Sequence, residues 1–384
     1  MRIGILTFHR SINYGAFMQS YALSKEIQKR YGDIVEIIDF EHIDKTRMYR
    51  PDFRKFIRHG MAYHKMFSRF RDDLCLLPLS PDAFITDDYS RIYEYINGRY
   101  DLVIVGSDAV WAYNHHLGLR NPYWLGPEIK CMKMSYAASA YSLDVKKVSS
   151  EERKYIAECL EGYAYIGVRD QETFDFVQSV GSGKEVNLNC DPTVLLPKPD
   201  VDMGKCILAR LGVDVSKKIV SFMISGNPYV DVIQKKLGRD YEYVMLLSQN
   251  RISDRLLPKG RHFLCDLSPY EWYTVFSCFC LNITKYFHGT LLALKSGVPT
   301  VSFDVTRMNY EYKSKIKQLM SDMHLEQFWI NNKDCSMNQI WTAIKYILEN
   351  REEVERLINA SMEEEKKKSV SFFRALDGII RNQK

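Results

Sequence analysis

The clearest folding signal in the chain is the segment Leu281-Asn-Ile-Thr-Lys-Tyr-Phe-His-Gly-Thr-Leu-Leu-Ala-Leu-Lys-Ser-Gly-Val-Pro-Thr-Val-Ser-Phe303. It predicts a buried strand, a His-Gly-Thr turn, a short apolar helix that ends at Gly297, and a second strand after Pro299. His288 would then lie at the carboxyl end of a strand and beside a helix N-terminus. Open α/β sheets bind ligands at this edge, and helix N-termini bind anions.

His288 is therefore a candidate catalytic or phosphate-binding residue. Gly289 lets the backbone approach a ligand closely, and Thr290 can offer its hydroxyl to the exposed N–H groups of the first helical turn. The alternative is that His288 only caps its helix. The neighbouring residues suit an anion, which favours the ligand-binding interpretation.

The first half of the chain predicts a doubly wound parallel sheet. It opens with a strand at 2–7, a polar loop, a helix at 16–30 and a second strand at 35–40. A parallel pair of strands needs a crossover of about this length. Further strands are expected at 100–106, 133–138, 164–168 and 185–189. Residues 1–197 are therefore expected to form one domain.

A second domain is expected because 384 residues, 46% of them hydrophobic, exceed what one core usually organises. Leu195-Leu-Pro-Lys-Pro-Asp200 predicts a linker, since closely spaced prolines disfavour helix and central strand alike. We expect residues 201–350 to form this domain and the charged helix 351–384 to pack back across the hinge onto the first. Two open α/β domains around one hinge would face each other across a deep cleft. The strands expected in the second domain are 218–224, 243–247, 262–264, 280–283 and 300–302.

A basic and aromatic helical insertion, at about residues 45–75, interrupts the first domain. Between Lys45 and Arg71, nine basic residues stand against one acidic residue, Asp52, with six Tyr and Phe rings among them. This mixture is typical of an interfacial helix that contacts anionic lipid. The alternative is a solvated helical hairpin whose aromatic residues pack on the domain.

Four loops follow predicted strands at their carboxyl ends and are expected to converge on the cleft. Their shared position carries more weight than any single short motif. In chain order they contain Arg10 with Asn13-Tyr14-Gly15, Asp108 with Trp111, Arg169 with Asp170, and Phe287 with His288.

Arg169 ends a predicted strand just before a helix that Asp170 can cap. A guanidinium at this place can bind a carboxylate or phosphate through two parallel hydrogen bonds. The alternative is an ion pair with a neighbouring carboxylate, such as Asp170 or Glu172. His9 and Arg10 could add positive charge at the same edge, and solvent exposure accounts for either equally well.

Asp108 and Trp111 are candidates for contact with a sugar. A carboxylate at a strand end can orient a hydroxyl or act as a base, and an indole can stack on the apolar face of a sugar ring. Asp108 could instead cap a turn. Asp191, which precedes Pro192, is expected to be structural because Asp-Pro favours a turn.

Several other classes of chemistry lose support. The sequence has no HExxH, GxSxG or GxxxxGK[ST] motif and no GxGxxG after the first strand. Nine cysteines occur without a CxxC pair, so no metal site is expected. A formal charge of +5 argues against a dedicated nucleic-acid binder. No window reaches the roughly 18 to 20 apolar residues of a membrane span and no cleavable signal is seen, so we expect a cytoplasmic protein.

Six segments, in chain order, form a recognisable set: ILTFHRSINYGAFMQSYAL, VIVGSDAVW, SYAASA, VRDQETFDF, NCDPTVLL and FHGTLLALKSGVPTVSFD, over roughly residues 1–305. Together they resemble the polysaccharide pyruvyl transferase family. The resemblance implies two Rossmann-like α/β domains in a GT-B-like architecture. It also implies transfer of pyruvate from phosphoenolpyruvate onto two sugar hydroxyls as a cyclic ketal.

The resemblance further implies that Arg169 and His288 contact phosphoenolpyruvate, that His288 takes part in proton transfer, and that Phe287 lines the same pocket. His288 and Asp108 are the expected catalytic residues. The residues expected to bind the donor are Arg169, Lys285, Phe287, His288, Gly289 and Thr290, and those expected on the acceptor side, in the first domain, are Arg10, Asn13, Tyr14, Gly15, Asp108 and Trp111.

Two sites depart from the usual family pattern. Lys285-Tyr286 stands where Asp-Ser commonly precedes Phe-His-Gly-Thr, and Ala109 and Ala112 stand where Gln and Asn usually flank Val-Trp. Lys285 could add a cation to the donor pocket. The alanines lack hydrogen-bonding groups that could recognise an acceptor sugar. Donor binding is expected to be kept.

We therefore expect a transferase that adds a pyruvyl ketal to a surface polysaccharide, such as an exopolysaccharide or capsule, or to its lipid-linked precursor. Phosphoenolpyruvate is the co-substrate, and no resident cofactor is expected. A glycan is the expected partner, and the anionic inner face of the cell membrane is a candidate peripheral contact. Two alternatives stay open: a nucleotide-sugar glycosyltransferase of the same architecture, and a non-catalytic glycan-binding member of the family.

Overall fold

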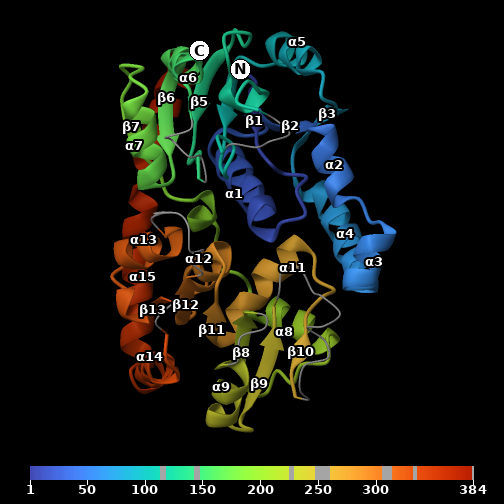
Figure 1. Cartoon of the computed structure of the whole chain (residues 1–384), viewed down its shortest axis with the longest axis vertical. Helices are drawn as coiled ribbons and strands as arrows, with labels where there is room; N and C mark the ends of the chain where they lie inside the picture. Colours follow the sequence, from blue (N-terminus) through green and yellow to red (C-terminus); the bar gives the residue numbers. More distant parts are fainter. Residues whose placement is uncertain are drawn as a thin grey trace. The chain divides into compact units, whose positions relative to one another are not determined.

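The computed structural model describes residues 1–112, 118–141, 148–224, 229–246, 260–304, 314–331 and 335–382 (Figure 1). The chain divides into two compact units, each assembled from separate stretches of sequence. Unit 1 contains Met1–Arg50, Leu74–Leu195 and Lys366–Lys384, and unit 2 contains Pro51–Asp73 and Leu196–Glu365.

These units differ from the expected domains in two respects. Most of the expected insertion, Pro51–Asp73, belongs to unit 2 and not to the first domain. The expected C-terminal helix is two helices, α15 (Arg351–Lys367) and α16 (Val370–Asn382), and α15 lies almost entirely in unit 2. The two C-terminal helices bury their apolar sides in different units, α15 mainly in unit 2 and α16 in unit 1.

Unit 1 is built on a seven-stranded sheet in the order β3-β2-β1-β4-β5-β6-β7, with every pair parallel. All residues of β1 and β4 are buried, as expected for central strands covered on both faces. The strand order reverses between β1 and β4, and such a switch point is where open α/β sheets bind ligands. The strands are β1 (Ile3–Leu6), β2 (Val35–Glu41), β3 (Leu79–Ile85), β4 (Leu102–Val105), β5 (Met132–Ser135), β6 (Tyr163–Val168) and β7 (Val186–Leu188).

The helices of unit 1 are α1 (Tyr14–Tyr31), α2 (Ile43–Tyr49), α5 (Tyr89–Arg99), α6 (Ser150–Glu161), α7 (Gln171–Ser179) and α16. The α16 helix contacts Tyr136, directly after β5, Tyr165 of β6 and Tyr31 of α1. The Phe372 ring packs on Tyr136 with centroids 4.6 Å apart, and the hydroxyls of Ser371 and Tyr165 lie 2.8 Å apart. The Tyr31 hydroxyl donates to Asp377 Oδ1 at 2.7 Å.

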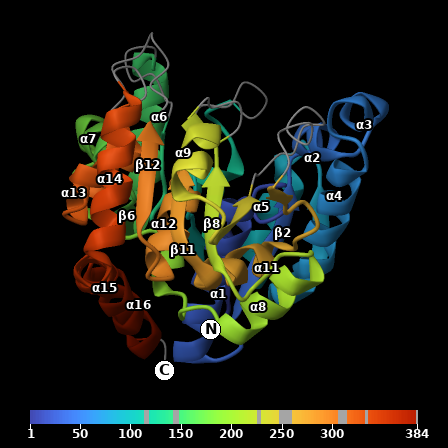
Figure 2. The same ribbon diagram turned by 90° about the horizontal axis from the view of Figure 1, so that it is seen from below.

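Unit 2 is built on a six-stranded parallel sheet in the order β10-β9-β8-β11-β12-β13. Helices α12, α13 and α14 pack along β12, and α14 lies beside that strand in Figure 2. The strands are β8 (Lys218–Met223), β9 (Tyr241–Met245), β10 (His262–Phe263), β11 (Phe279–Thr284), β12 (Thr300–Asp304) and β13 (Trp329–Asn331). The helices, besides α15, are α3 (Phe53–His59), α4 (Met61–Asp73), α8 (Val201–Arg210), α9 (Tyr229–Leu237), α11 (Pro269–Thr274), α12 (Phe287–Lys295), α13 (Lys315–Asp322) and α14 (Met337–Glu349). The expected strand 243–247 ends at Met245, and position 247 lies outside the described residues.

The α4 helix packs against α11 and buries Tyr63 and Phe70, so these rings pack within unit 2 and not on the first domain, where the hairpin alternative placed them. Arg69 Nε donates to Asp266 Oδ1 at 2.9 Å, and the Tyr270 N–H donates to Asp73 Oδ2 at 2.9 Å. A second group of apolar side chains remains exposed. It comprises Phe53 (75%), Phe56 (43%), Ile57 (60%) and Met61 (58%). No helix in the described part of the chain is long and apolar enough to cross a membrane.

Candidate functional site

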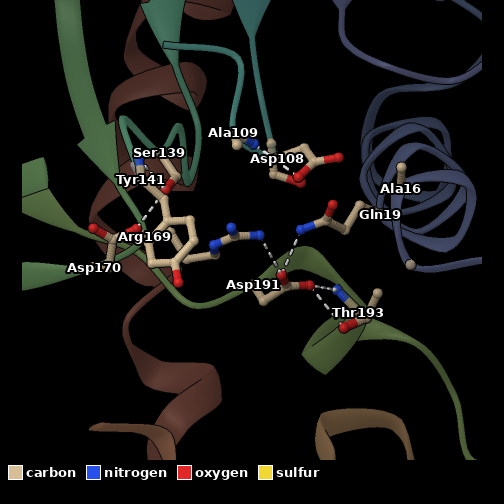
Figure 3. Close-up of polar contacts among 12 residues, drawn as sticks. Ala16, Gln19, Asp108, Ala109, Ser139, Tyr141, Arg169, Asp170, Asp191 and Thr193 are labelled. Carbon is tan, nitrogen blue, oxygen red and sulfur yellow. Dashed lines mark hydrogen bonds and ion pairs between the residues drawn. The ribbon is translucent and has the colours of Figure 1, made fainter. Parts of the chain in front are cut away.

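In unit 1, Asp108 and Arg169 lie at the carboxyl edge of the sheet, after strands β4 and β6 on either side of β5. Asp108 follows β4 and forms a parallel bridge with Ala138, and Ala138 forms a second bridge with Val168, the last residue of β6. Arg169 is the next residue. Asp108, Arg169 and Asp191 come together in this part of the fold, as Figure 3 shows.

Arg169 is held by Asp191, which follows β7. Arg169 Nη1 donates to Asp191 Oδ2 at 3.1 Å, and the two side chains are 6% and 3% exposed. The same oxygen accepts from Gln19 Nε2 of α1 at 2.5 Å, and Asp191 Oδ1 accepts from the Thr193 N–H and hydroxyl at 3.0 and 2.7 Å (Figure 3). Asp191 is structural, as expected. It also fixes the position of the Arg169 guanidinium at the carboxyl edge of the sheet.

Arg169 thus forms an ion pair with Asp191, a partner that the sequence alternative did not name. Asp170 caps α7, as predicted, by accepting from the Thr173 N–H at 2.9 Å. It also accepts from the Ser139 hydroxyl at 2.6 Å, which ties the loop after β5 to α7. The sequence offered no signal for the Asp191 contact, because 22 residues separate the partners.

Asp108 has a backbone conformation that is unusual for a residue with a side chain. Its φ is +82°, in the left-handed region that Asp tolerates better than most residues. Asp108 Oδ1 accepts from the N–H of Ala109 at 2.7 Å, and the Ser139 N–H donates to the Asp108 carbonyl at 2.9 Å. The side chain is half-buried, so the carboxylate retains access to solvent at the switch point.

Gly106 is required by this turn. A Cβ at this position would lie 2.3 Å from the Tyr136 carbonyl oxygen, and the φ of Gly106 is +110°. Only glycine meets both conditions. The turn therefore depends on the first residue of the Gly-Ser-Asp triplet, which sets where Asp108 lies.

The prediction that Trp111 stacks on a sugar is wrong. Its side chain is 0% exposed, and its ring is stacked on Trp124 with centroids 5.0 Å apart and planes at 5°. The indole Nε1 donates to the Tyr123 carbonyl at 2.9 Å, which satisfies its one donor. Trp111 belongs to the hydrophobic core.

His9 and Arg10 are not accounted for by solvent exposure. Both bind Asp39 of β2: His9 Nε2 lies 3.0 Å from Asp39 Oδ1, and the Arg10 guanidinium contacts both carboxylate oxygens, with Nη2 to Oδ2 at 2.6 Å. Burial of Asp39 opposes its charge, but the hydrogen bonds from His9 and Arg10 outweigh this and lower its pKa to about 2. The charge of Arg10 is thus already matched within unit 1.

The other expected acceptor residues begin α1. The Asn13 side chain is exposed and caps this helix by accepting from the Gly15 N–H at 2.9 Å. Tyr14 and Gly15 are buried. Of these three residues, only Asn13 presents its side chain at the surface of unit 1.

In unit 2, His288 lies in the first turn of α12, directly after β11. The helix begins at Phe287, and not after the His-Gly-Thr residues as expected. Its N-cap residue, Tyr286, makes no side-chain capping bond, and its first turn contains no acidic residue. The first N–H groups of a helix have no intrahelical acceptor and carry partial positive charge.

The expectation that the Thr290 hydroxyl binds the exposed N–H groups of the first helical turn is wrong. Thr290 is 0% exposed, and its Oγ1 donates to the Tyr286 carbonyl at 3.1 Å and lies 2.9 Å from Ser302 Oγ. Gly289 is explained by internal packing. A Cβ there would lie 2.6 Å from Thr284 Oγ1 and 2.7 Å from Met223 Sδ.

Three half-buried side chains accompany His288 in this segment. The Phe287 and His288 rings are nearly perpendicular, at 87°, with centroids 5.2 Å apart. Lys285 Nζ lies 5.6 Å from the centre of the Tyr286 ring. The segment thus presents an imidazole, an ammonium group and two aromatic rings around one helix N-terminus.

Within the described part of the chain, no group of three or more His, Cys, Asp or Glu residues could hold a metal ion.

A family model described as polysaccharide pyruvyl transferase matches residues 13–307. The chain belongs to this family. Membership supports a transferase role on polysaccharide, which confirms the expected family and enzyme class. No curated protein sequence matches the chain.

Solved structures similar to this polysaccharide pyruvyl transferase share its fold at low identity. A protein described as UDP-N-acetylglucosamine 2-epimerase from Listeria monocytogenes is 12% identical, with a TM-score of 0.59 over 99% of this chain and 97% of that chain. The UDP-GlcNAc 2-epimerase of Neisseria meningitidis, bound to UDP-GlcNAc, is 11% identical, with a TM-score of 0.57 over 98% and 99%. HepE of Anabaena, in complex with UDP and glucose, is 10% identical, with a TM-score of 0.52 over 99% of both chains. These similarities confirm a fold of two Rossmann-like α/β sheets of the GT-B type.

Sequence reasoning missed two residues of the unit 1 edge. Gln19 is a fully buried residue of α1, and a single glutamine within a helical sequence does not indicate a contact with a distant carboxylate. Lys45 was recognised only as part of a basic segment, whereas the structure separates it from that segment and places it in unit 1 on α2. The position of Lys45 could have been a signal. It lies soon after a predicted strand, because α2 begins two residues after the end of β2.

Proposed function

We propose that this enzyme transfers pyruvate from phosphoenolpyruvate to two hydroxyls of a sugar, in a surface polysaccharide or its lipid-linked precursor, as a cyclic ketal. The observation that carries the proposal is the first turn of α12, which has no side-chain cap and no acidic residue and holds His288. Such a turn attracts a phosphate or carboxylate, and an imidazole can exchange protons near neutral pH. Phosphoenolpyruvate offers both anionic groups and a carbon that must gain a proton.

The proposed reaction joins two sugar oxygens to one carbon. The first hydroxyl oxygen bonds to C2 of phosphoenolpyruvate, C3 gains a proton and becomes a methyl group, and the hydroxyl loses its proton. The second hydroxyl oxygen then bonds to C2 as the C2–O bond to phosphate breaks, and its proton leaves with phosphate or solvent. The products are the cyclic ketal and inorganic phosphate.

His288 is assigned as the proton donor to C3, and Arg169 as a ligand of the donor's anionic groups, as the family resemblance implies. A guanidinium held by a buried carboxylate keeps its orientation, which favours bidentate binding of a carboxylate or phosphate. Asp108, half-buried at the switch point of unit 1, is assigned to the acceptor hydroxyls. Proton transfer by a positioned side chain contributes about 10² to 10⁴ in rate.

The test is phosphate release from phosphoenolpyruvate in the presence and absence of a candidate glycan. His288→Asn, which preserves side-chain size without a titrating ring, should lower kcat by about 10²-fold or more with unchanged circular dichroism. Arg169→Lys, which keeps the charge but not the planar fork, should mainly raise KM for phosphoenolpyruvate. Wild-type turnover in His288→Asn would refute the histidine assignment.

A nucleotide-sugar glycosyltransferase is the competing function, because HepE of similar fold is seen with UDP and glucose. Thermal-shift measurements separate the two, since a ligand that binds only the folded protein stabilises it. Phosphoenolpyruvate should raise Tm, and UDP-sugars should not. A non-catalytic glycan-binding protein, suggested by Lys285, Tyr286, Ala109 and Ala112, would bind glycan without releasing phosphate.

We also propose that α3 contacts an anionic membrane surface, which would bring the enzyme to a lipid-linked acceptor. The exposed Phe53, Phe56, Ile57 and Met61 lie in sequence among Arg54, Lys55 and Arg58. Exposed apolar side chains among basic ones match an interface of hydrocarbon and anionic headgroups. The charge complementarity favours anionic lipid as the occupant.

Vesicle sedimentation tests this contact. The wild-type protein should sediment with phosphatidylglycerol vesicles more than with phosphatidylcholine vesicles, and Phe53→Ser with Ile57→Ser should abolish the difference. Val201→Ser with Met203→Ser is the matched control, because these residues are also exposed in unit 2, at 45% and 48%, but stand beside Asp200 and Asp202. Equal sedimentation of the wild type with both vesicles would remove the proposal.

A further inference from the structure

We propose that Lys45, with Asp108 beside it, is the proton acceptor for a hydroxyl of the glycan acceptor. The inference rests on the proposed ketal transfer and adds a residue that neither the family resemblance nor the sequence reading assigned. The observation behind it is a cluster at the switch point of unit 1. Its members follow three adjacent strands: Lys45 follows β2, Phe8 follows β1, and Asp108 follows β4.

The Lys45 ammonium lies on an aromatic ring and not on a carboxylate. Nζ is 2.9 Å from the centre of the Phe8 ring, a cation–π contact. Within the described part of the chain, the Lys45 side chain makes no ion pair or hydrogen bond. Arg10, which precedes α1 at the same edge, is by contrast fully engaged by Asp39. Among the described residues, Lys45 therefore makes no direct ion pair at the ligand-binding edge, in contrast to Arg10.

The groups that face Lys45 come from each neighbouring element. They are Asp108 after β4 and Glu41 at the end of β2, and Phe8 contributes only its ring. Burial lowers the pKa of Lys45 to about 8, although Asp108 and Glu41 each act to raise it. Glu41 also accepts a hydrogen bond from the Thr46 hydroxyl. About half of such amines are neutral near pH 8, and a neutral amine can accept a proton.

The proposed step completes the proton balance of ketal formation. As the first hydroxyl oxygen bonds to C2, its O–H bond breaks and the proton passes to the Lys45 amine, which becomes an ammonium group. The electrons of the C2–C3 double bond take up a separate proton at C3. The Asp108 carboxylate stabilises the ammonium that forms, and it can orient the hydroxyl.

Lys45→Arg is the decisive variant, because arginine keeps the positive charge but does not give up its proton at working pH. It should lower kcat by about 10²-fold or more at saturating phosphoenolpyruvate, with KM for phosphoenolpyruvate within about twofold of wild type. The rise of kcat with pH around pH 8 should disappear. Lys29→Arg, on the exposed face of α1, is the matched control and should behave as wild type. Wild-type kcat and an unchanged pH profile in Lys45→Arg would overturn the proposal.

A second measurement is independent of turnover. Competitive labelling of amines in the ligand-free protein, read peptide by peptide, gives the titration of Lys45 directly. Lys45 should titrate near pH 8, and Asp108→Asn should move its titration to lower pH. Titration at the ordinary pKa of about 10.4, with no response to Asp108→Asn, would overturn the role of Lys45 even if the enzyme forms the ketal. Failure of the wild-type enzyme to release phosphate would instead refute the proposed function, which the labelling result does not depend on.

Discussion

Arg169 Nη1 donates to Asp191 Oδ2 across 3.1 Å, and both side chains are almost completely buried. Asp191 also receives the Gln19 amide and the Thr193 N–H and hydroxyl, so one carboxylate joins α1, the end of β6 and the turn after β7. A buried charge pair is costly to break from one side, because the remaining charge stays in a medium of low polarity. Arg169 is thus both a candidate ligand and part of the framework of unit 1.

Asp191→Ala should therefore destabilise the protein strongly. We expect the free energy of unfolding to fall by about 3 kcal/mol or more, as for other buried pairs that lose one partner. Urea unfolding followed by circular dichroism measures this. Asp33→Asn, on an exposed residue before β2, is the control and should change stability by less than about 0.5 kcal/mol. A loss as small as that in Asp191→Ala would contradict the buried-pair interpretation.

Asp39 gives a prediction for pH. Its pKa is lowered to about 2, so it contributes stability above its unfolded value of about 3.9, and this contribution is lost as the pH falls towards 2. Asp39→Asn should lower the free energy of unfolding by about 2 kcal/mol at pH 7. The difference from wild type should shrink by about 1 kcal/mol between pH 5 and pH 3. A constant difference across this range in urea titrations would show that the charge of Asp39 is not responsible.

Trp111 should matter for stability and not for the acceptor. Trp111→Ala removes a fully buried indole and should cost about 3 to 5 kcal/mol. Trp111→Phe keeps part of the packing on Trp124, and in this folded variant KM for the glycan should stay within about twofold of wild type. A large rise in that KM without loss of Tm would restore a direct role in acceptor binding.

Gly289→Ala tests the packing of α12 on its sheet. The new methyl group would lie 2.6 Å from Thr284 Oγ1 and 2.7 Å from Met223 Sδ, and such overpacking typically costs about 1 to 3 kcal/mol. Gly98→Ala is the matched control, because this helical glycine of α5 has nothing within 4 Å of the added carbon. Alanine there should stabilise the protein slightly, since it favours helix over glycine. Similar effects at both positions would argue against close packing at Gly289.

The central strands and the edge strands β7 and β10 could be predicted from the sequence, whereas the edge strands β3 and β13 could not. β1 and β4 are runs without a polar side chain in which every residue is buried, so composition alone identifies them. β3 is an edge strand, Leu-Ser-Pro-Asp-Ala-Phe-Ile, in which Pro81 and several exposed residues hide the pattern. β13, also at an edge, has only three residues. Edge strands need less burial, so they leave a weaker signal.

The sequence predicts where the candidate site residues lie in the fold, but not which residues they contact. Chain order places Asp108 and Arg169 after strands, because a parallel sheet gathers its carboxyl ends at one edge. It does not reveal that Trp111 turns into the core, that Asp39 engages Arg10, or that Asp191 holds Arg169. These depend on distances between residues far apart in the sequence, which no local motif records.

One measurement tests the proposed pyruvate transfer from phosphoenolpyruvate most directly. The wild-type enzyme is incubated with phosphoenolpyruvate labelled with ¹³C at C3 and with a polysaccharide or lipid-linked acceptor, and the glycan is examined by NMR. The account predicts a labelled methyl group attached to a ketal carbon of the sugar, formed in equal amount with inorganic phosphate and absent with His288→Asn. Labelled carbon found only as free pyruvate or unreacted phosphoenolpyruvate, alongside glycosyl transfer from a UDP-sugar to the same acceptor, would contradict it.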